Sequence, residues 1–121
     1  ARPCISREII KNCEEAALQY GACTAAVPVK DTIKVVSPEG FAVDTPDRNT
    51  LWQIQTPQVF RSDIISSAYA KMYADTDRGT ITDDAMLVER YTDVPVKMAM
   101  GAYTNIKITT PEDMGIAAPY L

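Results

Sequence analysis

The 121-residue chain contains no histidine, and its three cysteines, Cys4, Cys13 and Cys23, are odd in number and irregularly spaced. Structural zinc sites combine cysteine and histidine at short regular spacings, and a disulfide framework needs paired cysteines. The sequence therefore argues against both a zinc site and a disulfide framework. Buried reduced thiols are favoured instead, which suits a reducing compartment and predicts a cytoplasmic protein.

The chain also lacks a long apolar run and an excess of positive charge. No apolar run approaches the roughly 20 residues that span a bilayer, so no membrane association is expected. The net charge is −4, from 12 basic and 16 acidic residues. Because nucleic-acid binding depends on lysine and arginine at the phosphates, nucleic acid is disfavoured as a partner. A small anion is not excluded, since the local placement of charge outweighs the net charge.

Helical and strand periodicities alternate along the chain, which indicates an α/β fold in at most one domain. Helices are predicted over 6–20, 61–74 and 83–90 and from 110 onward, with caps at Ser6, Ser62, Thr82 and Thr110. Strands are predicted over 22–29, 51–56, 94–100 and 105–109. Pro28 and Pro57 are expected to end central strand pairing, because proline donates no backbone hydrogen bond.

Residues 30–50, called the arm below, have the pattern of a β-hairpin. Strands are predicted over 31–36 and 41–45, joined by the turn Ser37-Pro38-Glu39-Gly40. The arm carries the apolar residues Val35, Val36, Phe41 and Val43 but is too small to bury them. We therefore expect the arm to protrude and to pack on another body.

The segment 47–60, with the sequence DRNTLWQIQTPQVF, holds the only tryptophan and places polar side chains on both faces of a strand. A solvated edge strand would explain this pattern without any function. Three other segments also contain motif-like runs: ARP at 1–3, GTITDDA at 79–85 and YTNIKITTPED at 103–113.

Together the four segments resemble the 2-C-methyl-D-erythritol 4-phosphate cytidylyltransferases. Residues 1–3 are similar to the end of that family's His-Asp-Ala-x-Arg-Pro motif. Residues 79–85 are similar to its threonine-aspartate turn, and residues 103–113 to its Asn-Ile-Lys segment. The segments occur in the family's order and span nearly the whole chain.

The resemblance implies a Rossmann-like nucleotidyltransferase domain with a protruding β-hairpin arm. The family's glycine-rich loop, Pro-Lys-Gln stretch and His-Asp pair have no counterpart here. We therefore expect residues 1–121 to be the C-terminal portion of one cytidylyltransferase domain, inactive alone and partnered by an N-terminal half. The arm is expected to join two subunits into a homodimer.

The implied reaction transfers a cytidylyl group from CTP to 2-C-methyl-D-erythritol 4-phosphate and releases pyrophosphate, in the non-mevalonate isoprenoid precursor pathway. Catalysis by such enzymes rests on positioning and charge neutralisation. Mg²⁺ is the implied cofactor, held mainly by the CTP phosphates and the N-terminal half, and no metal ligand is expected from this chain. For Asp83 and Asp84 we prefer the role of helix-dipole acids to that of metal ligands.

The resemblance assigns substrate positioning to Arg48 and Lys107. Arg48 would reach the neighbouring subunit's site, where its planar fork matches phosphate oxygens, and Lys107 would hold the substrate phosphate. It assigns substrate contacts to Arg2, Thr56 and Thr82. Taken alone, each residue also fits a role without function. Arg48 could be a surface arginine paired with Asp44 or Asp47, and Lys107 a solvated lysine. Arg2 could lie at a frayed terminus, while Thr56 could be an ordinary strand threonine and Thr82 a helix cap.

Two alternative functions remain open at this stage. A ribitol-5-phosphate cytidylyltransferase would share the fold and similar Thr-Pro-Gln and Asn-Ile-Lys segments, although the run from Asp47 to Trp52 favours the erythritol enzyme. A non-catalytic dimerisation module would use only the arm.

Overall fold

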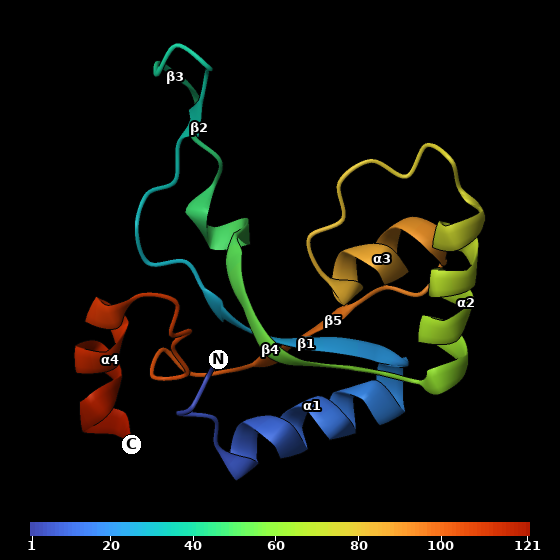
Figure 1. The fold of residues 1–121 in the computed structure, drawn as a ribbon, viewed down its shortest axis with the longest axis horizontal. Helices are drawn as coiled ribbons and strands as arrows, with labels where there is room; N and C mark the ends of the chain where they lie inside the picture. The colour runs from blue at the N-terminus through green and yellow to red at the C-terminus, as the bar shows by residue number, and fades with distance from the viewer.

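The computed structural model describes all residues 1–121 as an α/β fold around one three-stranded sheet (Figure 1). The elements are α1 (Arg7–Tyr20), β1 (Ala22–Pro28), β2 (Val35–Val36), β3 (Ala42–Asp44), β4 (Trp52–Phe60), α2 (Ser62–Ala74), α3 (Asp84–Tyr91), β5 (Lys97–Met100) and α4 (Pro111–Ala117). Short 3₁₀ turns occupy Arg48–Thr50 and Ala118–Tyr120. No helix has the length and apolar character needed to cross a membrane.

The central strand β1 is buried on both faces, and the sheet order is β4-β1-β5. β1 runs antiparallel to β4 and parallel to β5, so the sheet is mixed. Helix α1 covers one face, where Ile9, Cys13 and Ala17 pack on Cys23, Ala25 and Ala99. Helices α2 and α3 cover the other face through Ala68, Leu87 and Val88, which pack on Ala22.

The structure confirms the helix predicted over 6–20. The Ser6 side chain accepts a hydrogen bond from the backbone N–H of Ile9 at 3.2 Å, which satisfies one free amide of the first turn. Gly21 ends the helix with φ +91°, a left-handed conformation that favours glycine, and donates to the Ala17 carbonyl.

Two predicted helix caps are wrong by one residue. Helix α2 begins at Ser62 itself and follows Arg61, which makes no side-chain cap bond. Helix α3 is capped by Asp83, whose Oδ1 accepts from the Met86 N–H at 2.8 Å, and not by Thr82. Aspartate caps at least as well as threonine, so the helix begins one residue later than the threonine suggested. The predicted apolar face of α2 is confirmed, because Ala68 is buried in the core and Ile64, Ile65, Tyr69 and Met72 are partly buried against it.

The prediction that Pro57 ends its strand is wrong, since β4 continues to Phe60. Three residues of β4, from 55 to 57, lie opposite the single residue Ala25 of β1, so the ladder is interrupted by a bulge. β4 is also an edge strand of the described sheet. A proline costs no ladder hydrogen bond at such a position. Strand β1 does end at Pro28, opposite Trp52, and a single further backbone bond joins the Val29 N–H to the Leu51 carbonyl.

The strand predicted over 105–109 is absent, and the one predicted over 94–100 shortens to β5. Backbone bonds of the 105–109 segment run instead to the start of the chain. The Ile108 N–H donates to the Ala1 carbonyl at 2.7 Å, and the Ala1 amino group donates to the Ile108 carbonyl at 3.2 Å. A single partner residue is too short to make a strand ladder.

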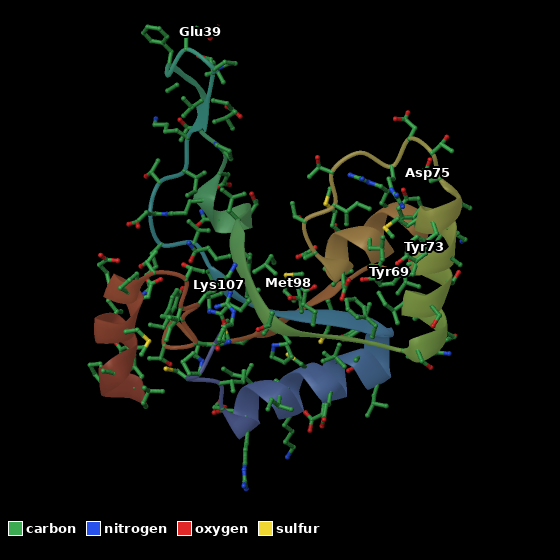
Figure 2. All side chains as sticks on the ribbon, in the orientation of Figure 1. Glu39, Tyr69, Tyr73, Asp75, Met98 and Lys107 are labelled. Carbon is green, nitrogen blue, oxygen red and sulfur yellow. The ribbon has the colours of Figure 1, made fainter.

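The arm is an antiparallel hairpin that extends away from the sheet, with Glu39 at its far end (Figures 1 and 2). Its two strands are shorter than predicted, at two and three residues. Val35, Val36, Phe41 and Val43 are 46, 55, 73 and 63% exposed, respectively. The arm therefore leaves its apolar residues uncovered within this chain.

Candidate functional site

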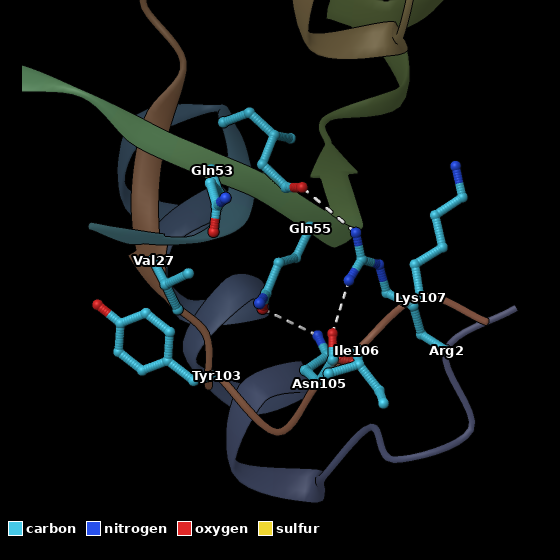
Figure 3. A pocket seen from close by; sticks show the side chains of 9 residues that line it. Arg2, Val27, Gln53, Gln55, Tyr103, Asn105, Ile106 and Lys107 are labelled. Atoms are coloured by element: carbon cyan, nitrogen blue, oxygen red, sulfur yellow. Dashed lines mark hydrogen bonds between the residues drawn. The ribbon is translucent and has the colours of Figure 1, made fainter. Parts of the chain in front are cut away.

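Two adjoining depressions of about 480 and 420 Å³ form an open groove beside β4. Arg2, Ile54, Gln55 and Lys107 line both, so the two depressions are continuous. Figure 3 shows the first depression. Its walls come from the start of the chain, from β1 and β4 and from the irregular segment that follows β5. The second extends to the loop before α3.

Four of the five predicted site residues lie in this groove. Arg2, Thr56, Thr82 and Lys107 all line the second depression, although they come from four separate segments of the chain. Thr56, Thr82 and Lys107 are exposed, so their polar groups are accessible to a ligand. The fold thus brings together residues that the sequence alone left far apart.

The charge of the groove suits an anion. Lys107 and Arg2 contribute two cations, and neither makes an ion pair, because the salt bridges of the chain are Lys11–Glu15 and Arg61–Asp63. The acidic residue of the groove is Asp83. Figure 3 shows the Lys107 side chain extending away from the amides beside it. Its ammonium group is therefore free to bind a phosphate.

The guanidinium of Arg2 is held on backbone carbonyls, and the chain start is not frayed at this residue. Nη1 donates to the Asn105 carbonyl at 2.6 Å and Nη2 donates to the Ile54 carbonyl at 3.3 Å. Partial burial lowers the pKa of Arg2 below its ordinary value, although the group stays cationic. Arg2 therefore links three segments and places positive charge at the floor of the groove.

Two buried amide side chains, which the sequence analysis did not single out, lie under the groove. Gln55 donates through Nε2 to the Ala102 carbonyl at 2.8 Å, and its Oε1 accepts from the Asn105 side chain at 3.1 Å. Asn105 also donates to the Thr56 carbonyl at 3.0 Å. The Asn105 Oδ1 atom is buried without a partner. The sequence held one signal for the burial of Gln55. The strand alternation places it on the same face as the apolar Leu51 and on the opposite face from Thr56.

In the threonine-aspartate turn at 79–85, the helix cap is Asp83 and not Thr82 as predicted. Asp83 caps α3 and its Oδ2 accepts from Gln58 Nε2 at 3.0 Å, while Gln58 Oε1 accepts from the Ala85 N–H at 3.1 Å. The Thr82 hydroxyl makes only a 3.5 Å contact with the Met86 sulfur. Since Asp83 does the capping, Thr82 keeps a hydroxyl that can donate to a ligand.

The acidic residues of this turn are engaged in bonds within the chain. Asp84 accepts a hydrogen bond from the Tyr69 hydroxyl, and that bond raises the pKa of Tyr69. No group of three or more histidine, cysteine or acidic side chains is placed to hold a metal ion. The groove's donor set of two cations and one bonded carboxylate does not fit Mg²⁺ by itself, because Mg²⁺ is bound through oxygen ligands.

Arg48 does not join the other four residues. It lies at the base of the arm, where Nη1 donates to the Lys30 carbonyl at 2.7 Å, and it lines neither depression. The alternative in which Arg48 pairs with Asp44 or Asp47 is wrong, because no such ion pair forms. Its exposed guanidinium keeps donors available for another molecule.

Comparisons with known proteins agree along the whole chain. The family model described as "IspD: 2-C-methyl-D-erythritol 4-phosphate cytidylyltransferase" matches residues 1–121. A relative with that enzyme name from Lachnospira eligens is 55% identical over 121 residues, which cover 100% of this chain and 53% of the relative. One from Caldanaerobacter subterraneus subsp. tengcongensis is 50% identical, over 100% of this chain and 52% of its own length.

Solved structures give the same result. The fold matches the 4-diphosphocytidyl-2C-methyl-D-erythritol synthase of Anaerococcus prevotii with a TM-score of 0.87 and 37% identity, over 98% of this chain and 54% of that chain. It matches the Francisella tularensis enzyme with a TM-score of 0.87 and 31% identity, over 100% of this chain and 56% of that chain. The chain thus spans about half the length of the relatives it matches.

Proposed function

Because this chain belongs to the 2-C-methyl-D-erythritol 4-phosphate cytidylyltransferase family, we propose that the protein containing it transfers a cytidylyl group from CTP to 2-C-methyl-D-erythritol 4-phosphate. The observation that carries the proposal is the groove, where Arg2, Thr56, Thr82 and Lys107 meet. A phosphate bound there would be surrounded by two cations and two hydroxyl donors. Such a site supplies the positioning and charge neutralisation that phosphoryl-type transfer requires.

In this reaction an oxygen of the acceptor phosphate attacks the α-phosphorus of CTP. A new phosphoanhydride bond forms, the bond between the α-phosphorus and its bridging oxygen breaks, and pyrophosphate leaves with the electron pair. Lys107 would hold the acceptor phosphate, while Thr56 and Thr82 would donate hydrogen bonds to the acceptor. Arg2, already fixed on two carbonyls, would add positive charge without having to reorganise.

Arg48 completes the proposed site from a second copy of the chain. Its distance in the fold from the groove, together with the uncovered apolar residues of the arm, supports a homodimer in which each arm reaches its neighbour. Mg²⁺ would neutralise charge on the CTP phosphates and would take its ligands from CTP and from the N-terminal half. The residues described here then form the acceptor side of a Rossmann-like cytidylyltransferase domain.

The names of the relatives favour methylerythritol phosphate over ribitol 5-phosphate as the acceptor, and so place the protein in non-mevalonate isoprenoid precursor synthesis. The built groove argues against a module that serves only for dimerisation. All three cysteines are free, which supports a cytoplasmic location.

The test is an assay of the full-length protein with CTP, Mg²⁺ and each of the two acceptors. We expect pyrophosphate release and a product of the mass of 4-diphosphocytidyl-2-C-methyl-D-erythritol with the erythritol acceptor. Residues 1–121 alone are expected to release none, because they carry no glycine-rich phosphate loop. The absence of pyrophosphate with full-length protein, or a higher kcat/KM with ribitol 5-phosphate, would contradict the proposal.

A further inference from the structure

The segment that carries Lys107 contains no helix or strand between the end of β5 at Met100 and the start of α4 at Pro111. It therefore has no regular strand ladder, and the backbone bonds nearest Lys107 are the pair between Ile108 and Ala1. A lysine that must place its ammonium group against a phosphate needs a fixed backbone, because small misplacements of a binding group cost a large part of the rate. The Ile108–Ala1 pair holds the segment after Lys107, and side-chain bonds hold the segment before it.

The side chains of Gln55 and Asn105, called the amide clamp below, fasten this segment to β4. Gln55 is 7% exposed and Asn105 is 0% exposed. Gln55 donates to the Ala102 carbonyl and accepts from the Ala102 N–H at 3.4 Å, so one side chain bonds both polar groups of one residue. Asn105 then bridges Gln55 Oε1 and the Thr56 carbonyl.

The Gln55 amide packs closely against the backbone at Gly101. Gly101 precedes the bonded Ala102, and a Cβ atom at Gly101 would collide with Oε1 of Gln55 and lie 3.4 Å from the Ala26 carbonyl. Arg2 adds a bond to the Asn105 carbonyl from the opposite side. Every one of these bonds reaches residues 102–105, shortly before Lys107, and Figure 3 shows the Gln55–Asn105 bond among the residues that line the first depression.

The chemistry of the clamp is unusual for a residue pair that only fills a core. Burying amides brings no advantage over apolar side chains of the same size unless their bonds specify a geometry. Here the clamp even leaves Asn105 Oδ1 without a partner. Its hydrogen bonds fix the backbone at 102 and 105, and through it the direction in which Lys107 leaves the chain.

We propose that Gln55 and Asn105 are a positioning pair for the reaction, which act through Lys107 by holding its segment on β4. The inference rests on the proposed function, since it takes Lys107 as the residue that binds the acceptor phosphate. It assigns no contact with substrate to either amide.

The first test is a kinetic double-mutant cycle in the full-length enzyme. Gln55→Leu, which keeps the size of the side chain and removes its bonds, is expected to lower kcat/KM for the acceptor about tenfold. In a Lys107→Ala background the same substitution should change kcat/KM less than about twofold, because the positioned group is gone. The KM for CTP should stay unchanged in both. Equal losses in the two backgrounds would overturn the inference, because the clamp would then act independently of Lys107.

Two further variants cover the case in which Gln55→Leu does not fold. Asn105→Ser removes the bonds to Gln55 and Thr56, and Gly101→Ala displaces the Gln55 amide without removing a polar group. Each should reproduce the acceptor-specific loss. Gly115→Ala is the matched glycine control, since a Cβ there meets nothing within 4 Å, and it should leave kcat/KM unchanged. Wild-type kinetics in folded Gly101→Ala and Asn105→Ser proteins would overturn the inference.

Amide hydrogen exchange separates this inference from the proposed function. In folded clamp variants, exchange at residues 102–108 should become about tenfold faster, while exchange in α2 stays unchanged. Unchanged exchange in an enzyme that makes the expected product overturns the clamp alone. A wild-type protein that makes no product overturns the proposed function and, with it, the positioning role of the clamp.

Discussion

At the scale of single residues, the cations of the groove divide into one that is fixed by the fold and one that is free. The Arg2 guanidinium is bonded to two carbonyls, whereas Lys107 has no ion-pair partner. Arg48, which the chain places outside the groove, is also exposed. Substitution at Lys107 or Arg48 should therefore affect ligand binding far more than folding.

The first prediction concerns Lys107→Ala and Arg48→Ala in the full-length enzyme. If both side chains bind phosphate as proposed, each substitution removes charge-assisted hydrogen bonds worth about 1.5–3 kcal/mol. We expect kcat/KM to fall roughly 10- to 100-fold, since about 1.4 kcal/mol is tenfold. Arg48→Lys should not restore full activity, because a point charge cannot replace the planar fork. Steady-state kinetics would measure the loss in variants whose melting temperatures match that of the wild type. Wild-type kcat/KM in both alanine variants would reject the roles proposed for Lys107 and Arg48.

Mixing the two alanine variants tests whether Arg48 acts across the dimer. In a mixed dimer, one site would receive an intact Arg48 and an intact Lys107 from different chains. Partial recovery of activity is expected on mixing. Confirmed mixed dimers without recovery would reject the cross-subunit role and leave the individual roles standing.

The second residue-scale prediction concerns the buried thiols. Burial, with Cys23 nearby, raises the pKa of Cys13 to about 12 from an ordinary value of 9.0. The folded state thus keeps a proton that the unfolded state releases. The contribution of the Cys13 thiol to stability is complete below pH 9 and is lost as the pH rises towards 12.

Urea unfolding of the full-length protein at pH 7 and pH 10 would measure this effect against Cys13→Ala. The variant should be less stable at pH 7, because it leaves a cavity at a side chain that is 0% exposed. The stability difference between the two proteins should narrow at pH 10, where only the wild type loses the Cys13 contribution. A difference independent of pH would count against the raised pKa.

At the scale of elements, the start of α4 fixes the far end of the Lys107 segment. Asp113 Oδ2 accepts from the backbone N–H groups of Thr109 and Thr110, both at 2.9 Å, and from the Thr109 hydroxyl at 3.1 Å. Proline follows at the first helical position. These are the features of a capping box, and they join residues 109 and 110 to the helix.

The third prediction follows from the Asp113 carboxylate. Hydrogen bonds from Thr109 and Thr110 lower the pKa of Asp113 below its ordinary value of 3.8. Its contribution to stability is therefore present above pH 3.8 and is lost as the pH falls through the lowered pKa. Hydrogen-exchange protection of α4 should fall in that acid range in the wild type.

Asp113→Asn should reduce α4 protection at pH 7 and remove this acid dependence, because the amide cannot replace a charged acceptor of three bonds. Glu112→Gln is the matched control, since Glu112 lies in the same turn and makes none of these bonds. Equal protection in the two variants would show that the cap does not hold α4.

At the scale of the whole molecule, the arm has no local core, and Arg48 at its base lies outside the groove. Phe41 is 73% exposed on the arm, and Val43 beside it is 63% exposed. Both observations would be explained if the arm packs on a second copy.

The fourth prediction is that the full-length protein is a dimer at micromolar concentration and that Phe41→Ser weakens it. Sedimentation should show a shift towards monomer, because the arm loses its largest apolar side chain. Tyr73→Ser is the matched control: Tyr73 is an equally exposed aromatic residue, at 72%, on α2 (Figure 2), and its loss should leave the dimer intact. A wild-type monomer would contradict the proposed role of the arm.

The sequence by itself determined the features that depend on local chemistry. Ser6 and Gly21 define the ends of α1 because capping and a left-handed exit need only neighbouring atoms. The apolar spacing of α2 marked its buried face. Arg2, Thr56, Thr82 and Lys107, in contrast, were indicated by the resemblance of their motifs to the family and not by local chemistry. Periodicity and capping are short-range effects, so they can be read within a few residues.

Only the tertiary structure decided what depends on partners distant in the chain. Pro57 lies within β4 because its register opposite β1 contains a bulge, and residues 105–109 form no strand because their partner is Ala1. The roles of Gln55 and Asn105 rest on bonds across 50 residues. A buried amide looks the same in sequence as an exposed one. Its function follows from which donor and acceptor the fold places within hydrogen-bond distance, because an unpaired polar group is costly once it is buried.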